Sequence, residues 1–379
     1  MRIGYAYWGF LADIKLDDAG NEISAPDGNA TYSWSILWEA IKRGHQVFKM
    51  HEDRDRPAWE RYNNGIFKSF SQEKRSEAYT ATNDTFGRQL PELDVLLLEW
   101  RFPIPGRNCI EDHTTGKYIL PVDPKTRELL PGYQPDLLRQ TELLEHYKTK
   151  NTKIIVWDLD HKLLRRDEEL WNPDAVFETS ITPLELKVKR TSVEPPFIIS
   201  DLLQHTTLPS DPSRKMVYIG SRYERDDVIE EWIRPASERF PGEIEFHGNW
   251  LKTLGEVKKM WPNISYHDRC TVSDFHRIYS TAASCPLLAK RSYLETGFIT
   301  PRVWEAILFG TVPIGLKSAK GIEKYVYLYA EDSYELSCFS ELLSRKNFQS
   351  MRADIRRSNA EKLEFMDAKY FVDKIEAVL

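Results

Sequence analysis

The segment LLAKRSYLETGFITPRVWEAILFGTVPIG, residues 287–315, carries the strongest fold signal in the chain. Its apolar start predicts a strand over 286–289 that ends in a basic pair. Thr300 and Pro301 then open a helix over 302–309, which Gly310 ends, and a second strand follows over 312–314. A strand, a helix and another strand in this order are typical of a parallel α/β sheet.

The same alternation continues on both sides of this segment. The expected strands cover residues 3–8, 45–50, 95–99, 153–157, 175–177, 216–219 and 244–247. The expected helices cover 33–43, 135–149, 226–233 (ended by Pro235), 273–279 and an amphipathic C-terminal stretch in the last 20 residues. The proline-rich residues 191–214 lack any sustained period. We therefore predict two consecutive α/β domains, 1–190 and 215–379, joined by a linker over 191–214, with a terminal helix able to pack on either domain.

Composition narrows the classes of protein that fit. The 379 residues carry 52 Lys and Arg against 58 Asp and Glu, a net charge of −6, so the chain is not a generally basic polyanion binder. Any nucleic-acid contact must then be a local basic patch. The four cysteines are scattered without metal-ligand spacing, and no apolar run of membrane-spanning length or signal-peptide pattern occurs. These features predict a cytoplasmic protein with free thiols and no bound metal; we also expect a monomer.

Two turns at predicted strand ends suit an anionic ligand. Gly220 and Ser221 lie directly after a strand and before a helix, where free backbone N–H groups receive phosphates, and Arg222 or Arg225 adds charge. The alternative is an ordinary turn with solvated arginines.

The second turn opens the helix over 302–309. Arg302 and Glu305 lie one helical turn apart, where a cation could meet a diphosphate while the carboxylate accepts hydrogen bonds from ribose hydroxyls. The alternative is a surface ion pair.

The words FITPRVWE, IEFHGN and VYIGS resemble the DNA β-glucosyltransferases of T-even bacteriophages, which are GT-B glycosyltransferases. The similarity is clearest over residues 216–315. It implies two Rossmann-like domains facing a central cleft, with UDP-sugar bound by the C-terminal domain. It further implies inverting transfer to 5-hydroxymethylcytosine in duplex DNA without a required cofactor, although a divalent cation could stimulate the reaction. A phage-encoded enzyme of this kind would modify DNA in the host cytoplasm and help it evade restriction.

The resemblance also assigns roles on the donor side. Arg302 matches the arginine that binds the diphosphate and Glu305 the glutamate that binds ribose, while Arg222 or Arg225 matches the arginines of the first phosphate loop. Gly248 falls in the segment lining the uracil pocket, and Cys270 lies where a backbone contact to the base is expected.

On the acceptor side, the segment KIIVWDLDH, residues 153–161, ends a strand with two aspartates. Alignment on its Lys-Ile pair places the catalytic base at Asp160, for which a helix N-cap is the alternative role. The remaining acceptor or DNA candidates share this region; they are Asp158, His161, Lys162, Arg165 and Arg166. The lysines and arginines among them could also form a solvated face. Thr31 and Tyr32 stand where the family has a Ser-Glu pair, which leaves the sugar open.

Three functions therefore remain open from the sequence. The leading hypothesis is UDP-sugar transfer to hydroxymethylated pyrimidine in DNA. The second is a GT-B transferase that acts on a polysaccharide or small molecule, which the acidic charge favours. The third is a nucleotide-sugar-binding or DNA-binding module without turnover.

Overall fold

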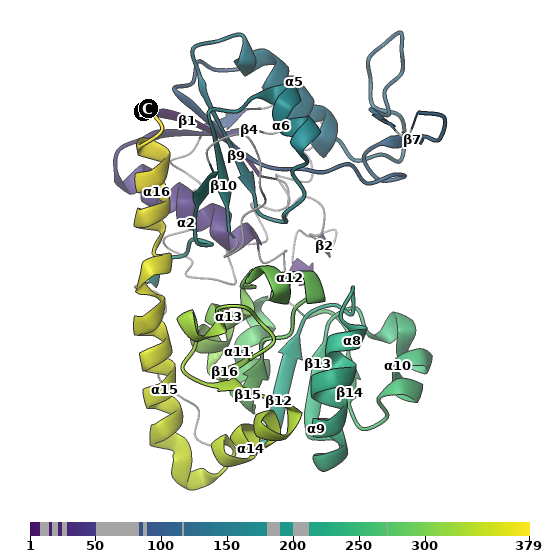
Figure 1. The fold of residues 1–379 in the computed structure, drawn as a ribbon, viewed down its shortest axis with the longest axis vertical. Helices are drawn as coiled ribbons and strands as arrows, with labels where there is room; N and C mark the ends of the chain where they lie inside the picture. The colour runs from purple at the N-terminus through teal and green to yellow at the C-terminus, as the bar shows by residue number, and fades with distance from the viewer. Residues whose placement is uncertain are drawn as a thin grey trace.

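The computed structural model describes residues 1–7, 15–16, 22–24, 29–50, 83–85, 89–115, 117–179, 190–199, 212–270 and 272–379. Two α/β domains lie one above the other along the long axis (Figure 1). No described helix combines the length and apolarity needed to cross a bilayer.

A seven-stranded, all-parallel sheet forms the N-terminal domain. Its order is β11 (Arg190–Ser192), β10 (Ala175–Glu178), β9 (Lys153–Asp158), β6 (Val95–Glu99), β1 (Arg2–Ala6), β4 (Gln46–Met50) and β5 (Asn83–Thr85). Alternate residues of β6 point to opposite faces. Leu96 and Leu98 pack in the cluster of α5 (Asp136–Lys148), whereas Val95 and Leu97 pack in that of α2 (Asn29–Lys42).

The C-terminal domain holds a six-stranded parallel sheet. Its order is β14 (Ser265–His267), β13 (Ile244–His247), β12 (Arg214–Ile219), β15 (Ala282–Pro286), β16 (Val312–Leu316) and β17 (Tyr329–Ala330). The helices around it are α8 (Asp226–Val228), α9 (Arg234–Arg239), α10 (Leu254–Met260), α11 (Val272–Ser280), α12 (Arg291–Thr296), α13 (Arg302–Phe309) and α14 (Ser333–Leu343). Short 3-10 turns cover Leu251–Thr253, Ile322–Lys324, Lys346–Phe348 and Leu363–Met366.

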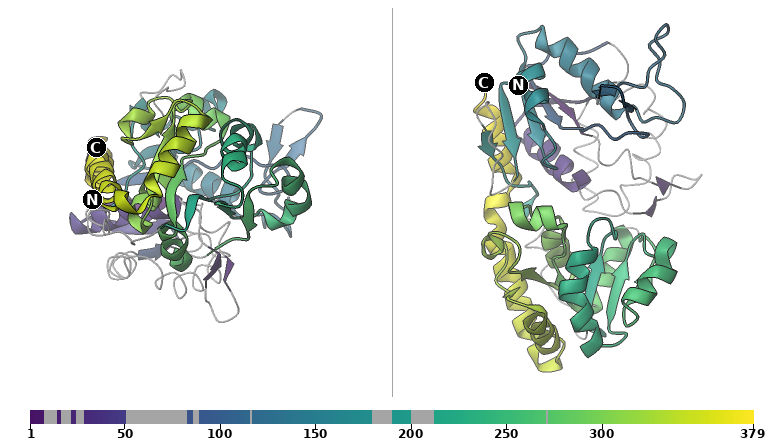
Figure 2. Two further views of the ribbon diagram at one scale, coloured as in Figure 1. Left: turned by 90° about the horizontal axis from the view of Figure 1, so that it is seen from below. Right: turned by 45° about the vertical axis from the view of Figure 1, so that its right-hand side comes forward.

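The C-terminal helices connect the two domains. Helix α15 (Gln349–Lys362) lies on the C-terminal domain, and α16 (Ala368–Glu376) lies beside α2 of the N-terminal domain (Figures 1 and 2). Phe371 of α16 packs against Trp157, with ring centroids 4.9 Å apart, and against Phe177 at 5.5 Å. Arg43 pairs with Asp373 at 2.6 Å. A continuous hydrophobic core therefore runs from the first sheet to α13, which fixes how the domains face each other.

A projecting arm and a small hairpin interrupt the N-terminal domain. Residues 101–134, which the composition marks as a long polar loop, include the antiparallel strands β7 (Ile110–Asp112) and β8 (Lys117–Ile119) and extend away from the domain (Figure 1). Arg101 holds the arm to α5 through Asp136 at 2.5 Å. Strands β2 (Lys15–Leu16) and β3 (Glu22–Ser24) form the other antiparallel pair.

Several boundaries differ from the sequence-based prediction, and three of these differences have a clear physical reason or bear on the domain division. The strand predicted over 286–289 is β15, Ala282–Pro286, because its small residues give a weak hydrophobic signal although all five are buried. The helix does not end at Pro235; a π-helical turn, Ile229–Ile233, precedes this proline, whose missing N–H is accommodated at the start of α9. The predicted linker begins inside β11, and residues 200–211 lie outside the described part of the chain.

Candidate donor and acceptor site

Gly220 and Gly248 lie in close contact at the carboxyl end of the second sheet. A Cβ on Gly248, whose φ is +151°, would lie 2.3 Å from the Gly220 carbonyl oxygen. A Cβ on Gly220 would lie 2.3 Å from Nη2 of Arg302. The Gly220 carbonyl also accepts a hydrogen bond from Nε1 of Trp250 at 2.8 Å. Gly248 is glycine because the backbone of Gly220 approaches it closely, and Gly220 is glycine because the side chains of Arg302 and Tyr218 fill the space where a Cβ would lie.

Arg302 is the first residue of α13 and reaches back to β12. Its Nε donates a hydrogen bond to the Ile219 carbonyl at 2.6 Å, and its guanidinium lies over the Tyr218 ring at 4.8 Å. Within the described part of the chain, no carboxylate lies within ion-pair distance of this guanidinium. The backbone therefore fixes the side chain while its two terminal nitrogens stay available for an anion.

A second arginine lies close to Arg302. Arg225 is 7% exposed and donates through Nη1 to the carbonyls of Ser221 and Tyr223, at 3.2 and 2.8 Å. Its buried Nε has no hydrogen-bond partner among the described residues. Burial, together with repulsion by Arg302, lowers the pKa of Arg225 below its usual value. A buried and a half-buried cation, neither with a described carboxylate within ion-pair distance, are costly in the free protein and suit a bound polyanion.

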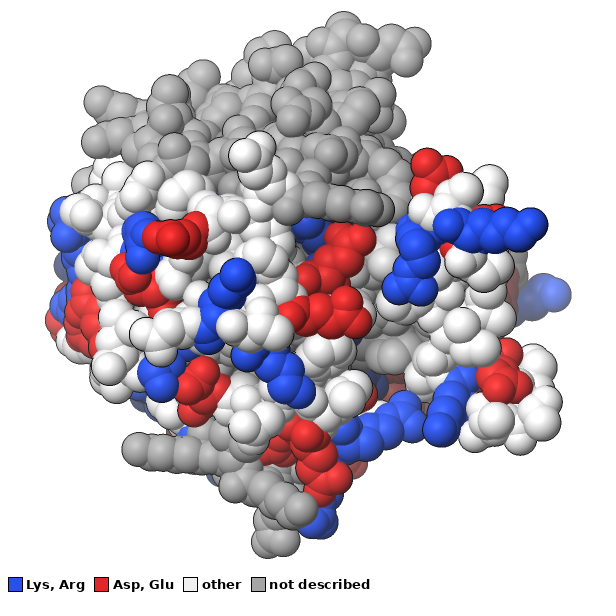
Figure 3. Space-filling model, turned by 90° about the horizontal axis from the view of Figure 1, so that it is seen from above, with Lys and Arg blue, Asp and Glu red and all other residues white. Residues whose placement is uncertain are grey.

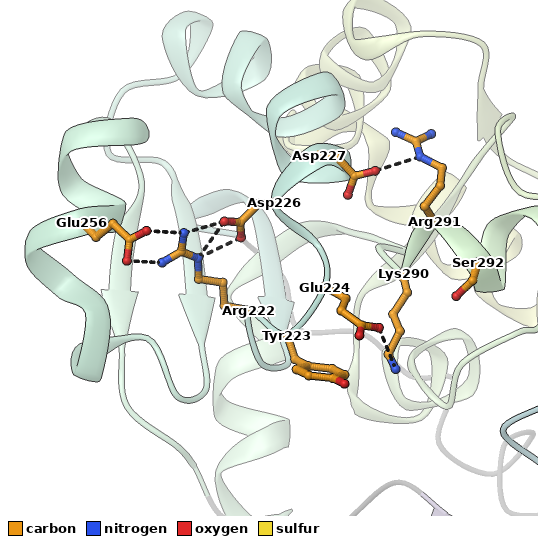
Figure 4. A pocket seen from close by; sticks show the side chains of 9 residues that line it. All are labelled: Arg222, Tyr223, Glu224, Asp226, Asp227, Glu256, Lys290, Arg291 and Ser292. Carbon is orange, nitrogen blue, oxygen red and sulfur yellow. Dashed lines mark hydrogen bonds and ion pairs between the residues drawn. The ribbon is translucent and has the colours of Figure 1, made fainter. Parts of the chain in front are cut away.

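Arg222 faces away from this pair. Its guanidinium is bound by Asp226, with contacts of 2.5–3.1 Å, and by Glu256 at 2.7 Å. Both contacts are drawn in Figure 4. Of the two arginines predicted for the first phosphate loop, the structure brings Arg225, and not Arg222, to Arg302.

Glu305 follows Arg302 by one turn of α13, and Cys270 lies near Glu305. Glu305 is 9% exposed and accepts a hydrogen bond from the Tyr279 hydroxyl at 3.4 Å. Burial, with the charges of Asp274 and Glu305, raises the pKa of the Cys270 thiol to about 12. Cys270 is therefore a neutral neighbour of Glu305, and its thiol is not a nucleophile at physiological pH.

Asp160 approaches this region from the first domain. It lies in the turn after β9, and its Oδ1 accepts a hydrogen bond of 2.8 Å from the hydroxyl of Tyr293 in α12. Its Oδ2 makes no hydrogen bond to any described residue. The Lys290 ammonium lies over Tyr293 at 4.9 Å and over Tyr223 at 4.5 Å. The carboxyl ends of the two sheets thus face each other, with one carboxylate opposite the arginine pair.

A cavity of about 790 Å³ opens beside this junction, between the Arg222 loop and residues 290–292 (Figure 4). It is lined by Arg222, Tyr223, Glu224, Asp226, Asp227, Glu256, Lys290, Arg291 and Ser292. Its cations are paired: Lys290 with Glu224 at 3.2 Å, and Arg291 with Asp227 at 2.9 Å. Because its charges are paired, this cavity is a polar opening beside the anion site and is not the anion site itself.

Hydrogen bonds of Asp158 and His161 hold the loop that contains Asp160. Asp158 is 1% exposed, and its two oxygens accept hydrogen bonds from the backbone N–H groups of Lys162 and Leu163, at 2.8 and 3.1 Å. This geometry does not support the predicted acceptor contact of Asp158, because both oxygens hold the loop. His161 adopts a φ of +55° and donates from Nδ1 to buried Glu178 at 2.9 Å.

The predicted basic group lies on the same face as the arm. Lys162 stands over Phe102 at 5.8 Å and Arg166 over Tyr118 of the arm at 5.5 Å, while Arg165 pairs with Glu169 at 3.1 Å. Seen from above, basic and acidic side chains alternate over this face (Figure 3). The basic surface is therefore interrupted.

The comparisons identify the architecture. No family model and no curated protein sequence matches the chain. Among solved structures, an alpha-glucosyltransferase in complex with UDP-glucose and DNA containing an abasic site is similar at a TM-score of 0.60 and 14% identity. T4 phage BGT with its UDP-glucose substrate follows at 0.57 and 12%, and T4 phage BGT with UDP and Mn²⁺ at 0.57 and 13%. Each match covers 100% of this chain and 99% of the other. The chain has the GT-B fold.

Two residues of the site, Tyr293 and Tyr218, were not found from the sequence. Tyr293 was missed because only the folded chain brings α12 to Asp160, although its place after the Lys290–Arg291 pair is a signal. Tyr218 was missed as well: it lies in the predicted strand over 216–219, and its ring lies against the Arg302 guanidinium. The side chain of Thr31 lies outside the described residues, whereas Tyr32 is buried beside Trp304 at 6.5 Å between ring centroids.

Proposed function

We propose that the protein transfers a sugar from a UDP-sugar to the hydroxymethyl group of 5-hydroxymethylcytosine in duplex DNA, with inversion at the anomeric carbon. The observation that carries the proposal is the pair of buried Arg225 and half-buried Arg302 in one domain, opposite Asp160 in the other. Support comes also from the similar structures, whose titles name UDP-glucose and DNA.

The two arginines would bind the diphosphate and stabilise the charge that develops on departing UDP. They would act with the backbone N–H groups around Gly220, while Glu305 holds the ribose. Their positions are set before the donor arrives, because carbonyls of Ile219, Ser221 and Tyr223 already hold both guanidiniums. This chemistry needs no cofactor, and a divalent cation on the diphosphate would add to the same stabilisation.

Asp160 would act as the general base. The hydroxymethyl oxygen attacks the anomeric carbon from the face opposite UDP, and Asp160 takes its proton. The free Oδ2 is the atom suited to this role, because Oδ1 is held by Tyr293. A direct displacement of this kind inverts the anomeric centre.

We propose that duplex DNA contacts the arm and the loop that precedes helix α6 (Arg165–Trp171). Lys117, Lys125 and Arg127 of the arm are exposed and have no described carboxylate within ion-pair distance, and the same holds for Lys162 near the cleft. Together these cations would give the confined strip that an acidic protein needs to bind phosphates. We further propose that the enzyme acts as a monomer on its DNA.

The test is to incubate the protein with UDP-glucose and duplex DNA containing hydroxymethylcytosine, digest the DNA and weigh the nucleosides. We expect a nucleoside heavier by one sugar, and none from matched DNA with unmodified cytosine. Other UDP-sugars, including UDP-arabinose, are tested in parallel. Absence of an adduct with every donor would refute the DNA acceptor, and sugar transfer to a polysaccharide or small molecule instead would establish the competing function.

A further inference from the structure

Three metal-binding side chains gather on one face at the edge of the second sheet. Glu245 and His247 are two residues apart on β13, so both point to the same side. His267 of β14 is the direct register partner of His247. This face is the one opposite the core that holds Phe246 and Tyr266.

The ligand atoms converge on one point. Nε2 of His247 lies 3.4 Å from Oε2 of Glu245, and Nε2 of His267 lies 4.0 Å from the same oxygen. All three ligand atoms lie within 4.8 Å of one another. Metal-ligand bonds of roughly 2.0–2.2 Å in a tetrahedron require ligand atoms about 3.3–3.6 Å apart. His247 and Glu245 already meet this spacing, and His267, whose side chain is 44% exposed, can close the remaining gap.

The surroundings orient the carboxylate for this role. Nε of Arg214 binds Oε1 of Glu245 at 2.5 Å, which leaves Oε2 directed at the imidazoles. The two imidazole rings stack with centroids 4.3 Å apart, so both lie beside the same carboxylate. Imidazole nitrogens and an oriented carboxylate are ligand types that Zn²⁺ binds in proteins.

We propose that Glu245, His247 and His267 form a three-ligand site for a divalent transition metal of the Zn²⁺ class. Two imidazoles and one carboxylate select such metals over Mg²⁺ and Ca²⁺, which prefer oxygen ligands. The ligands all come from side chains of this chain, so binding requires no UDP. His247 directly precedes Gly248, and a bound metal would join the ends of β13 and β14 next to the donor loop.

The site is tested by titrating chelator-treated full-length protein with Zn²⁺ in the absence of UDP, using calorimetry. We expect one ion per chain, and we expect His247→Gln and His267→Gln each to weaken binding by about 100-fold or more, since even the loss of an outer-shell partner costs 10–100-fold. His113→Gln is the control, because this side chain is 87% exposed and far along the chain in the arm.

A second measurement separates ligand loss from misfolding. Zn²⁺ should raise the thermal unfolding midpoint of the wild type and the control but not of His267→Gln, and Co²⁺ should give tetrahedral d–d absorption only in the first two. Circular dichroism confirms that each variant is folded. Absence of stoichiometric binding, or unchanged binding in either ligand variant, would overturn the proposal without bearing on sugar transfer.

Discussion

Exchange of Arg225 for methionine tests which arginine of the first loop holds the donor. Met keeps most of the apolar stem and removes a guanidinium that is buried beside Arg302 and has no carboxylate partner among the described residues. A hydrogen bond to a charged group is worth about 1.5–3 kcal/mol, so UDP should bind roughly 10- to 150-fold more weakly. Arg222→Met is the matched control, with a change below about threefold, because Asp226 and Glu256 already occupy its guanidinium.

Calorimetry gives the UDP dissociation constants, and thermal unfolding gives an independent readout. UDP at 100 times the wild-type dissociation constant stabilises the protein by about 2.7 kcal/mol. For a variant that binds 30-fold more weakly, the same UDP concentration adds only about 0.9 kcal/mol, so the UDP-induced shift in midpoint falls to about a third. The reasoning fails if Arg222→Met loses UDP binding and Arg225→Met keeps it.

Three further predictions concern the donor loop, the Asp160 loop and the arm. Gly248→Ala should weaken UDP binding at least about tenfold, because the new Cβ would meet the carbonyl oxygen of Gly220. Gly242→Ala is the control: φ is +76° there and nothing lies within 4 Å of the new Cβ, so it should cost only about 1 kcal/mol of stability and leave UDP affinity unchanged. Burial, the largest single influence, raises the pKa of Glu178, but the contacts with His161 and Arg190 together outweigh it and hold this pKa below its usual value of 4.5. The stabilisation from Glu178 is therefore present above pH 4.5 and lost on acidification. Denaturant unfolding should therefore show Glu178→Gln destabilised at neutral pH and converging on the wild type as pH falls; a constant difference would contradict this. Replacing Lys125 and Arg127 by alanine should lower the slope of log affinity for DNA against log salt by up to about 2, with UDP binding intact, and an unchanged slope would remove the arm from the interface.

Elements with clear end signals could be predicted from the sequence. The helix over 302–309 was predicted with its observed bounds, because a proline opens it and Gly310 adopts a φ of +110° to end it. The strand over 244–247 was also predicted with its observed bounds. Strand β15 was not, since its small residues are buried by their central place in the sheet rather than by their own hydrophobicity.

The directions of the site's side chains were harder to predict from the sequence than the positions of the residues along the chain. The sequence placed Arg222 and Arg225 in one turn but could not choose between them, because the choice depends on Asp226 and on Glu256 from another helix. The resemblance chose Asp160 over Asp158 as the base, but the residue types alone do not distinguish the two. Only the folded loop shows that one holds backbone N–H groups and the other faces the second domain.

The central claim is that Asp160 activates the acceptor opposite a separate donor site. The most direct test compares wild type and Asp160→Asn for sugar incorporated into hydroxymethylcytosine DNA, with UDP affinity measured on the same samples. Loss of the general base should slow transfer by about 10²- to 10⁴-fold while UDP affinity stays within about twofold. Transfer at the wild-type rate by Asp160→Asn would contradict the account.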